Sequence, residues 1–423
     1  MSQRQVDVHE KLPLIQMLPL GFQHLFAMFG ATVLVPLLTG LPPAVALFTS
    51  GTGTLLFIVI TQGKVPAYLG SSFAFIAPII AISSMWGIAY ALGGAMAVGL
   101  IYLLVSLLIS QIGTRWIDRI LPPVVIGSVI IVIGLGLAGV GVDMAGLTGD
   151  NVTFANPSVR ISLFTLAVTI TASVLLKGFL AVIPVLIGIF FGYIFAIAQG
   201  VVDFSVVREA AWIAIPEFTT PRFGFAAIAM MAPVALVTIA EHLGDVMVIG
   251  RVTGKDFFRN PGLHKTLLGD GVATAWAGLF GGPPNTTYGE NVGVMAITRV
   301  YSVWVIGTAA TLAVLLSFFS KFSALITTIP VPVMGGVSIV LFGVIASSGI
   351  RTLVESGIDF SAKRNLIISS VILILGIGGA QLAFGDFQLH GMALATVVGV
   401  LLNVVLPAEP AHVGASQDEG TAV

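Results

Sequence analysis

Apolar residues in this chain are grouped into blocks of roughly 20, the length that a helix needs to cross the hydrocarbon core of a bilayer. Of the 423 residues, 57% are hydrophobic and 9% are charged, and the mean hydropathy is +1.06. Soluble domains carry about 25% charged residues. These values predict an all-α polytopic membrane protein.

The blocks predict fourteen transmembrane spans. Their approximate limits are 14–38, 43–62, 69–87, 91–111, 121–141, 160–177, 179–200, 225–250, 264–281, 286–299, 301–320, 329–349, 365–382 and 390–407. If the chain starts in the cytoplasm, fourteen of its 18 Lys and Arg residues fall on the cytoplasmic side and four on the other side. This bias follows the positive-inside rule, so we expect both termini in the cytoplasm.

The two ends of the chain carry fewer constraints. The first block, 14–38, is too long for the apolar region of a signal peptide, so no cleavable signal is expected. The segment 408–423 is small and polar, and we predict that it is disordered.

Composition and motifs also disfavour several classes of protein. The net charge is −1, so nothing indicates a nucleic-acid partner. The chain has no Cys, which excludes disulfides, thiolate nucleophiles and thiolate metal sites. It shows neither a nucleophile elbow with a Ser-His-Asp set nor a Walker loop. We therefore expect no enzyme, no primary pump, and no metal or cofactor.

The two halves of the chain share a pattern. Gln23-His24-Leu25 recurs as Glu241-His242-Leu243, and Pro123, Gly127 and Gly134 recur with the same steps as Pro332, Gly336 and Gly343. Matches in the same order predict a duplicated unit of seven spans. Because seven is odd, the second copy must be inverted in the membrane. Inverted repeats are typical of secondary transporters.

Two of the predicted spans, the third and the tenth, are short and broken. Ser71-Ser72-Phe73-Ala74-Phe75 interrupts the third, and the segment 281–289, rich in Gly, Pro, Asn and Thr, precedes the tenth. Both contain residues that favour strands. Two short strands could pair at the membrane midplane and leave some backbone groups for a ligand. The alternative is a pair of re-entrant loops with only structural roles.

Ionisable residues within the spans are expected to be few and functional. They are His24, Glu241, His242, Asp245 and Glu290, with Arg299 at a span end. Glu290 follows the broken backbone of the tenth span. Glu241 and Asp245 are four residues apart and share one helix face, where two ionised carboxylates would repel each other. Such a pair suits a proton carrier, or else a structural link to a neighbouring helix. The histidines could instead brace helices.

At these residues the chain resembles the nucleobase–ascorbate transporter family. The family signature is matched in full by Glu290-Asn291-Val292-Gly293-Val294-Met295-Ala296-Ile297-Thr298-Arg299. The pair Gln23-His24 is a second family mark, and the resemblance runs from about Leu14 to Pro407. Within the family, the stretches 67–75 and 284–290 are most similar to bacterial uracil permeases.

The resemblance implies a fold of fourteen spans in two inverted seven-span repeats, divided between two domains. The core domain would comprise 1–112 (spans 1–4) and 223–320 (spans 8–11). The gate domain would comprise 113–222 (spans 5–7) and 321–407 (spans 12–14). It also implies proton-coupled uptake of uracil across the bacterial cytoplasmic membrane by alternating access, by a homodimer embedded in the lipid bilayer.

Carried over by position, the resemblance also assigns the site. Substrate-binding residues would be Glu241, Glu290, Phe73, Gly289 and Tyr288. The acids would accept the N–H groups of uracil, Gly289 would offer backbone groups, and Phe73 and Tyr288 would sandwich the ring. Proton coupling would involve Glu241, Asp245 and His24.

Two positions keep alternatives open. Uracil permeases carry His where this chain has Asp245, and the purine-transporting branch can carry an acid there. Purine carriers, however, usually have Gln where this chain has Glu290. A purine or xanthine symporter is therefore the alternative within the family, with sodium as an alternative coupling ion. A facilitative channel for small neutral solutes is the alternative from another class, although it has less use for paired broken helices.

Overall fold

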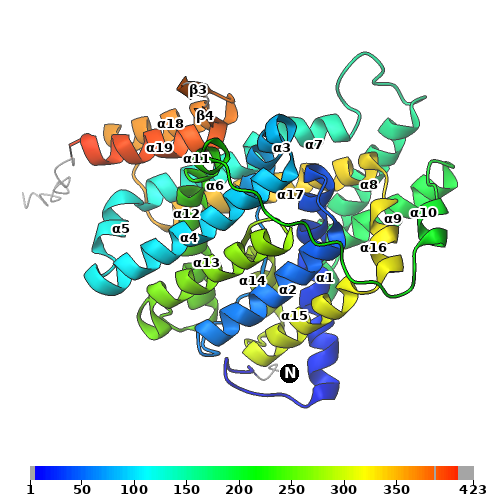
Figure 1. Cartoon of the computed structure of the whole chain (residues 1–423), viewed down its shortest axis with the longest axis horizontal. Helices are drawn as coiled ribbons and strands as arrows, with labels where there is room; N and C mark the ends of the chain where they lie inside the picture. The colour runs from blue at the N-terminus through cyan, green and yellow to red at the C-terminus, as the bar shows by residue number, and fades with distance from the viewer. Residues whose placement is uncertain (1–4, 385–386, 408–423) are drawn as a thin grey trace, which may run out of the picture.

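The computed structural model of the protein describes residues 5–384 and 387–407. The predicted disorder of 408–423 lies outside the described residues. Within them the chain is mostly helical, and two small two-stranded sheets interrupt the helices (Figure 1).

Helices of the first half follow the expected apolar blocks. Their bounds are α1 (Leu14–Thr39), α2 (Pro43–Ile60), η1 (Phe73–Phe75), α3 (Ile76–Trp86), α4 (Ile88–Ile112), α5 (Arg115–Ile120), α6 (Pro123–Gly136), α7 (Ala138–Met144), α8 (Pro157–Leu175), η2 (Gly178–Val182), α9 (Pro184–Ala198) and α10 (Ser205–Glu209). Proline stands in the first turn of α2, α6, α8 and α9, where its missing N–H is not needed.

Helices of the second half are similar in kind. Their bounds are α11 (Phe225–Met231), α12 (Val234–Thr253), η3 (Phe258–Gly262), α13 (Leu263–Phe280), α14 (Gly289–Thr298), α15 (Val303–Ser317), α16 (Ser320–Thr327), α17 (Val331–Glu355), α18 (Lys363–Ile377) and α19 (Gly391–Val405). The strands are β1 (Leu69–Ser71), β2 (Asn285–Thr287), β3 (Gln381–Phe384) and β4 (Phe387–His390).

The number of membrane-length helices is smaller than fourteen. Among the described residues, seven helices are long and apolar enough to cross a membrane, or eight if α15 and α16, bent by 84°, are one span. Three other apolar helices, Phe73–Trp86, Pro184–Ala198 and Gly391–Val405, are shorter. The difference arises partly where the third and tenth spans fold as a strand followed by a short helix, and partly because α9, α15, α18 and α19 have only 15 residues each.

The sheet of β1 and β2 joins the two halves of the chain. The strands are antiparallel, with Leu69 opposite Thr287 and Ser71 opposite Asn285. All six strand residues are buried. Side chains of α2 complete the backbone pairing, since Ser50 donates to the Leu69 carbonyl at 2.7 Å and the Leu69 amide donates to Thr54 at 2.9 Å. Away from water, each backbone group needs such a partner.

Close contact between α6 and α17 depends on glycine. A Cβ at Gly127 would lie 2.6 Å from Leu353, and one at Gly349 would lie 2.6 Å from the Gly127 carbonyl. Without side chains the two backbones approach closely, as is common between membrane helices.

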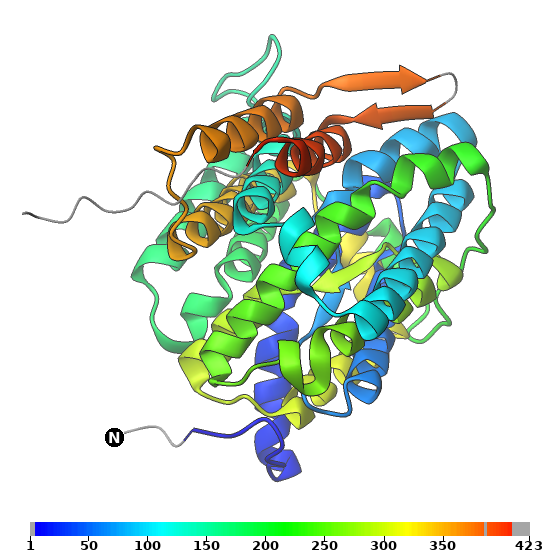
Figure 2. The same ribbon diagram turned by 90° about the vertical axis from the view of Figure 1, so that its left-hand side faces the viewer.

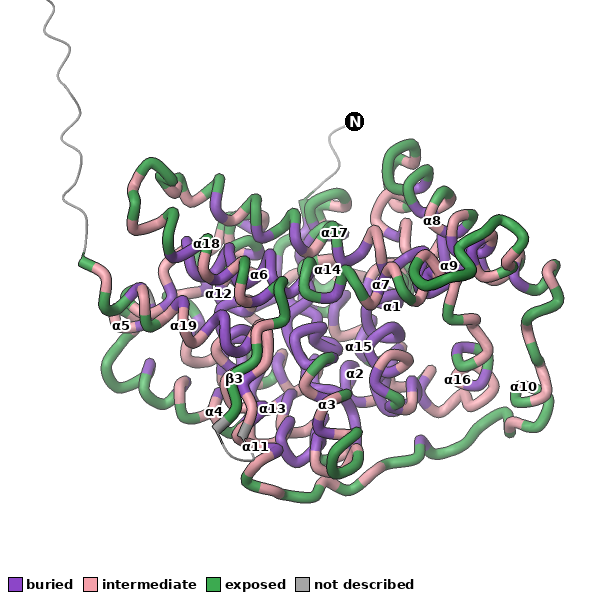
Figure 3. The backbone as a smooth tube through the Cα atoms, turned by 90° about the horizontal axis from the view of Figure 1, so that it is seen from above, coloured by how far each residue is buried: buried purple, intermediate pink, exposed green. Residues whose placement is uncertain are grey.

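Buried residues lie in the interior of the molecule, between the packed helices, and exposed residues lie around its rim (Figure 3). Much of the exposed surface is apolar; Leu104, Ile374 and Val405 are examples. Such a surface suits lipid contact, because lipid tails are as apolar as these side chains.

A β-hairpin lies on the opposite side of the molecule from the start of α1 (Figure 2). β3 and β4 are antiparallel, with Gln381 opposite His390, and they connect α18 to α19. The sequence prediction placed strands only in the third and tenth spans and extended a helix to residue 382. It missed this hairpin because the prediction continued the apolar run of the thirteenth span through Gly378-Gly379, the glycines that end the run before Gln381.

Candidate substrate site at the paired broken segments

Two acids on α12 face the β1–β2 sheet. Glu241 Oε2 accepts hydrogen bonds from the hydroxyls of Thr286 at 3.3 Å and Ser72 at 3.5 Å. One turn further, Asp245 Oδ2 accepts a hydrogen bond from the Thr287 hydroxyl at 3.1 Å. The spacing of four residues predicted a shared helix face, and both side chains do meet the same sheet.

The third acid, Glu290, lies in the first turn of α14, directly after β2. The first turn of a helix leaves backbone N–H groups without helical partners and carries a partial positive charge. Gly289 brings this helix start against α12, since a Cβ there would lie 3.5 Å from Asp245 Oδ1. The start of α14, with Glu290, therefore lies close to the α12 helix face that carries Glu241 and Asp245.

The three acids are only partly buried. Glu241, Asp245 and Glu290 remain partly accessible, whereas the strand residues behind them are buried. On α14 the side of Glu290 continues through the exposed positions Gly293 and Ile297. These residues are three and seven positions on, so they lie on one helix face that leads from the acids to the end of α14.

The predicted aromatic residues lie on different elements. Phe73 is buried at the start of η1, and its ring contacts Phe342 of α17 edge-on at 5.9 Å. The Tyr288 ring stacks on Tyr68 at 6.5 Å and fills the space above Gly70. The structure thus packs Tyr288 tightly against the sheet, while Phe73 reaches the helix α17.

The hydroxyl of Tyr288 is also engaged by protein groups. It donates to the Ser71 carbonyl at 3.0 Å and accepts from the Thr32 hydroxyl at 3.2 Å. These bonds attach the end of β2 to β1 and to α1, so Tyr288 holds the site together from behind.

His24 has a specific partner next to Glu290. The Asn291 amide donates to the His24 carbonyl at 3.1 Å, and its nitrogen lies 3.1 Å from His24 Nδ1. Both residues are buried. His24 therefore ties α1 to the first turn of α14, which is the bracing role that the sequence left open beside proton coupling.

Asp270 was missing from the predicted set of ionisable residues within the spans, and that set was therefore incomplete. Asp270 lies on α13 with its side chain fully buried, and its Oδ2 lies 3.1 Å from Nδ1 of the fully buried His242. The other ring nitrogen of His242 lies 3.0 Å from the Thr266 hydroxyl. The signal that could have found it was present, because Asp270 stands in the apolar block 264–281.

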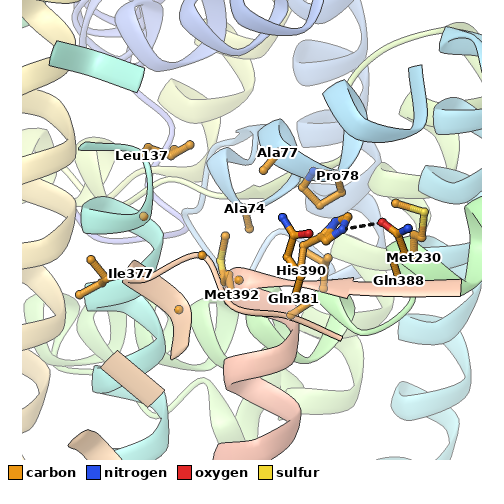
Figure 4. Close-up of a pocket in the computed structure, with 16 residues that line it drawn as sticks. Ala74, Ala77, Pro78, Leu137, Met230, Ile377, Gln381, Gln388, His390 and Met392 are labelled. Atoms are coloured by element: carbon orange, nitrogen blue, oxygen red, sulfur yellow. Dashed lines mark hydrogen bonds between the residues drawn. The ribbon is translucent and has the colours of Figure 1, made fainter. Parts of the chain in front are cut away.

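A cavity of about 200 Å³ lies beyond the start of α12. Ala74, Ala77 and Pro78 form one wall, and Gln381, Gln388 and His390 of the hairpin form a polar edge opposite (Figure 4). His390 Nε2 and Gln388 Oε1 are 2.9 Å apart. Val234 also lines this cavity, and it stands on the helix that carries Glu241 two turns away. The cavity is therefore separated from Glu241 by about two turns of α12, on the side of the hairpin.

Solved structures share this architecture at low sequence identity. The structure titled "The overall structure of SLC26A9" matches with a TM-score of 0.67 and 14% identity, over 92% of this chain and 64% of that chain. The transmembrane domain of the cyanobacterial bicarbonate transporter BicA matches with a TM-score of 0.63 and 16% identity, over 95% and 99% of the two chains. At these identities the likeness shows a shared membrane-transporter fold.

Sequence comparisons define the family. The model of the Xan_ur_permease group, described as "Permease family", matches residues 15–384. Uracil permease of Bacillus caldolyticus is 52% identical over 417 residues, covering 97% of this chain and 96% of that protein. Uracil permease of Escherichia coli strain K12 is 51% identical over 406 residues, covering 96% and 94%. The chain is a multi-pass membrane protein that belongs to the nucleobase–ascorbate transporter family.

Proposed function

We propose that this protein takes up uracil with a proton across the bacterial cytoplasmic membrane by alternating access. The observation that carries the proposal is the meeting of Glu241, Asp245 and Glu290 around the paired broken segments. The two relatives described above, both uracil permeases at about half identity over nearly the full chain, supply the substrate. A permease family and fold also favour a transporter over an enzyme.

The proposed topology has fourteen spans with both termini in the cytoplasm. Each of the fourteen apolar blocks coincides with a described helix, or with a strand followed by a helix. The third block corresponds to β1, η1 and α3, and the tenth corresponds to β2 and α14. In this arrangement the short helices complete spans whose other half is a strand.

Packing between the helices supports the inverted repeat. α4 packs on α13, and α2 packs on α15. These two contacts are equivalent in an inverted repeat, because span 4 (α4) corresponds to span 11 (α15) and span 9 (α13) corresponds to span 2 (α2). Likewise α8 and α9 pack on α17 as α18 and α19 pack on α6. The pairs α6–α17 and β1–β2 each join equivalent positions of the two halves. A two-fold relation between two seven-span units accounts for all of these contacts.

The same contacts support a core and a gate. α2 and α4 pack on α13, and α1 packs on α15, which groups 1–112 with 223–320. In the other group, α17 contacts α6, α8 and α9, and α6 contacts α18 and α19 (Figure 1). These contacts group 113–222 with 321–407. The acids lie in the proposed core, and Phe342 of the proposed gate reaches Phe73.

The chemistry of uracil fits this set of polar groups. Uracil is planar and neutral, with two N–H donors and two carbonyl acceptors. Carboxylates of Glu241 and Glu290 would accept the donors, and backbone N–H groups at Gly289 and at the start of η1 would donate to the carbonyls. Phe73 would cover one face of the ring. Tyr288 would form the wall behind the strands rather than the second half of a sandwich.

Proton coupling follows from the crowding of carboxyl groups. Three neighbouring acids repel one another when all are ionised, so a proton bound among them relieves this repulsion. Asp245 is the natural second proton site beside Glu241, and His24 is tied up by Asn291.

A neutral substrate moving with one proton carries charge inward. Each 100 mV then contributes roughly 2.3 kcal/mol, about a fifty-fold gradient. We also propose that the protein works as a homodimer.

The test is uptake of labelled uracil into proteoliposomes with imposed pH, voltage or sodium gradients. We expect accumulation driven by an inward proton gradient and by an inside-negative voltage, with little effect of sodium. Competition by excess xanthine and thymine would identify the substrate class. Preferred uptake of xanthine would support the purine alternative, for which Asp245 is the favourable feature. Equilibration without accumulation under any gradient would support a channel.

Asp245 offers a sharper test of coupling. Asp245→Asn keeps a side chain that can pair with Thr287 but cannot release a proton at this position. It should weaken the pH dependence of uptake more than it weakens uracil binding. Unchanged proton-driven accumulation in this variant would remove Asp245 from the coupling role while leaving the substrate assignment intact.

A further inference from the structure

A groove with a volume of about 850 Å³ lies on the outer face of the helices near the start of the chain. Its walls come from the beginning of α1, the end of α2 and the first three turns of α15. Leu14, Val59 and Leu315 contribute apolar side chains that are largely exposed. None of the three acids and no residue of the β3–β4 hairpin lines the groove, so the proposed transport site does not use it.

The floor of the groove is apolar although it contains hydroxyl groups. Thr308 and Thr311 of α15 donate their hydroxyls to the carbonyls of Trp304 and Gly307, each at 2.8 Å. Each hydroxyl donor is thereby used within the helix. A Cβ at Gly307 would lie 3.7 Å from Cδ1 of Ile58, an ordinary contact with another residue that lines the groove. The result is a hollow without unsatisfied polar groups on its floor.

The dimensions match one leaflet of a bilayer. From Val303 to Leu315, α15 rises about 18 Å at 1.5 Å per residue. Half of a hydrocarbon core of about 30 Å is about 15 Å. An acyl chain that enters at the end of α15 near Trp304 would therefore run along the whole groove.

The mouth of the groove is polar and basic. His9 and Gln62 line it beside Trp304. The exposed Lys11 places its ammonium 4.9 Å from the centre of the Trp304 ring. Nearby, Asp7 is paired with Lys255 at 2.7 Å, Lys64 donates to Asn260, and Glu10 also stands in this segment. An indole with a cation above it is the usual arrangement at a membrane interface.

We propose that this groove binds one acyl chain of an anionic phospholipid, with the lipid phosphate beside Lys11. An apolar hollow facing the bilayer does not hold water favourably, and leaving it empty forfeits contacts on every wall. A flexible chain fills it, and the polar mouth stands where the headgroup of the same lipid lies. The charge of Lys11 selects the anionic class, since a cation near the surface contributes about 1 kcal/mol, or roughly five-fold.

The test uses the full chain reconstituted in vesicles of defined phosphatidylethanolamine and phosphatidylglycerol, then extracted for native mass spectrometry. Thr311→Phe fills the groove from its exposed side. Thr171→Phe is the matched control, because Thr171 on α8 is also exposed and also donates to the carbonyl four residues before it. We expect one retained phosphatidylglycerol in the native chain and in Thr171→Phe, and none in Thr311→Phe. Gly307→Leu fills the groove from its floor and serves as a second variant.

Lys11→Gln tests the headgroup separately. This variant should still retain a lipid, but the ratio of retained phosphatidylglycerol to phosphatidylethanolamine should fall by roughly five-fold. Equal lipid retention in Thr311→Phe and Thr171→Phe would overturn the site. An unchanged lipid preference in Lys11→Gln would overturn the anionic class. A dimer that Thr311→Phe dissociates, with lipid retention unchanged, would assign the groove to a second copy of the chain.

Discussion

Arg251 at the end of α12 and Glu355 at the end of α17 form an ion pair. α12 carries two of the site acids, and α17 belongs to the proposed gate. Both side chains are about half exposed, at 49% and 44%. The pair therefore links the two proposed domains at the end of the molecule where α14 also terminates. Exposed ion pairs contribute about 0–1 kcal/mol, so this link biases the arrangement of the domains without locking it.

Glu355→Gln should allow the two helix ends to separate more readily. The chain has no Cys, so a single Cys at Gly293, on the exposed face below Glu290, reports access to the site. We expect a water-soluble maleimide to modify Gly293→Cys up to about five-fold faster when Glu355→Gln is added. The charge swap Arg251→Glu with Glu355→Arg should restore the slower rate. A swap that labels as fast as the single change would argue against the pair.

Glu290→Ala should lower uracil affinity by at least about ten-fold, because an N–H of the bound base would lose its acceptor. Binding to the purified protein measured by calorimetry checks this. Glu217→Ala removes an exposed acid distant in sequence from the site and should bind normally. Normal affinity in Glu290→Ala would show that the site assignment is wrong.

The buried pair of His242 and Asp270 should contribute to stability as a unit. Asp270→Leu leaves a buried ring nitrogen of His242 without its partner, and an unsatisfied buried polar group costs about 1–3 kcal/mol. Thermal unfolding in detergent should show a large loss for Asp270→Leu. The double change His242→Leu with Asp270→Leu should be less destabilising than the sum of the single changes. Simple additivity would show that the two residues are not coupled.

Gly70→Ala should impair uptake through Tyr288. A Cβ at Gly70 would lie 2.6 Å from the Tyr288 ring, so the ring must shift and its bond to Ser71 must lengthen. Such overpacking costs about 1–3 kcal/mol. Gly343→Ala is the matched control, because no atom lies within 4 Å of a Cβ there. Equal uptake rates in the two variants, at equal membrane levels, would contradict a positioning role for Tyr288.

The N-terminal segment should detach on acidification. The hydrogen bond from Lys255 lowers the pKa of Asp7 below 3.8, and Val6 pairs with the backbone at Arg299 and Tyr301. A lowered pKa gives stability that is present above the unfolded value and is lost as pH falls through the folded value. Proteolysis of the segment by pepsin should therefore accelerate below about pH 4. Asp7→Asn should remove this pH dependence, whereas Asp203→Asn, which is remote from the segment, should leave it unchanged.

Much of the site was predictable because its signals are local. An acid in an apolar block, and Gly, Pro and Asn before Glu290, are visible within a dozen residues. The same reasoning located the break at Ser71–Phe75, and the resemblance then assigned roles to Phe73 and Tyr288. The hairpin of β3 and β4 also had local signals, since Gly378-Gly379 precede it and Gly385-Asp386 separate its strand segments, but the apolar run around it favoured a continuous span.

The sequence by itself determined the class of the protein, the position of its broken segments and three of the acids within its spans, since length, hydropathy and helix-breaking residues act over short stretches. Only the tertiary structure decided that Thr286 meets Glu241, that Asp270 meets His242 and that Arg251 meets Glu355. These partners come from different helices and strands. Their meeting depends on how whole helices pack, which no short stretch of sequence specifies.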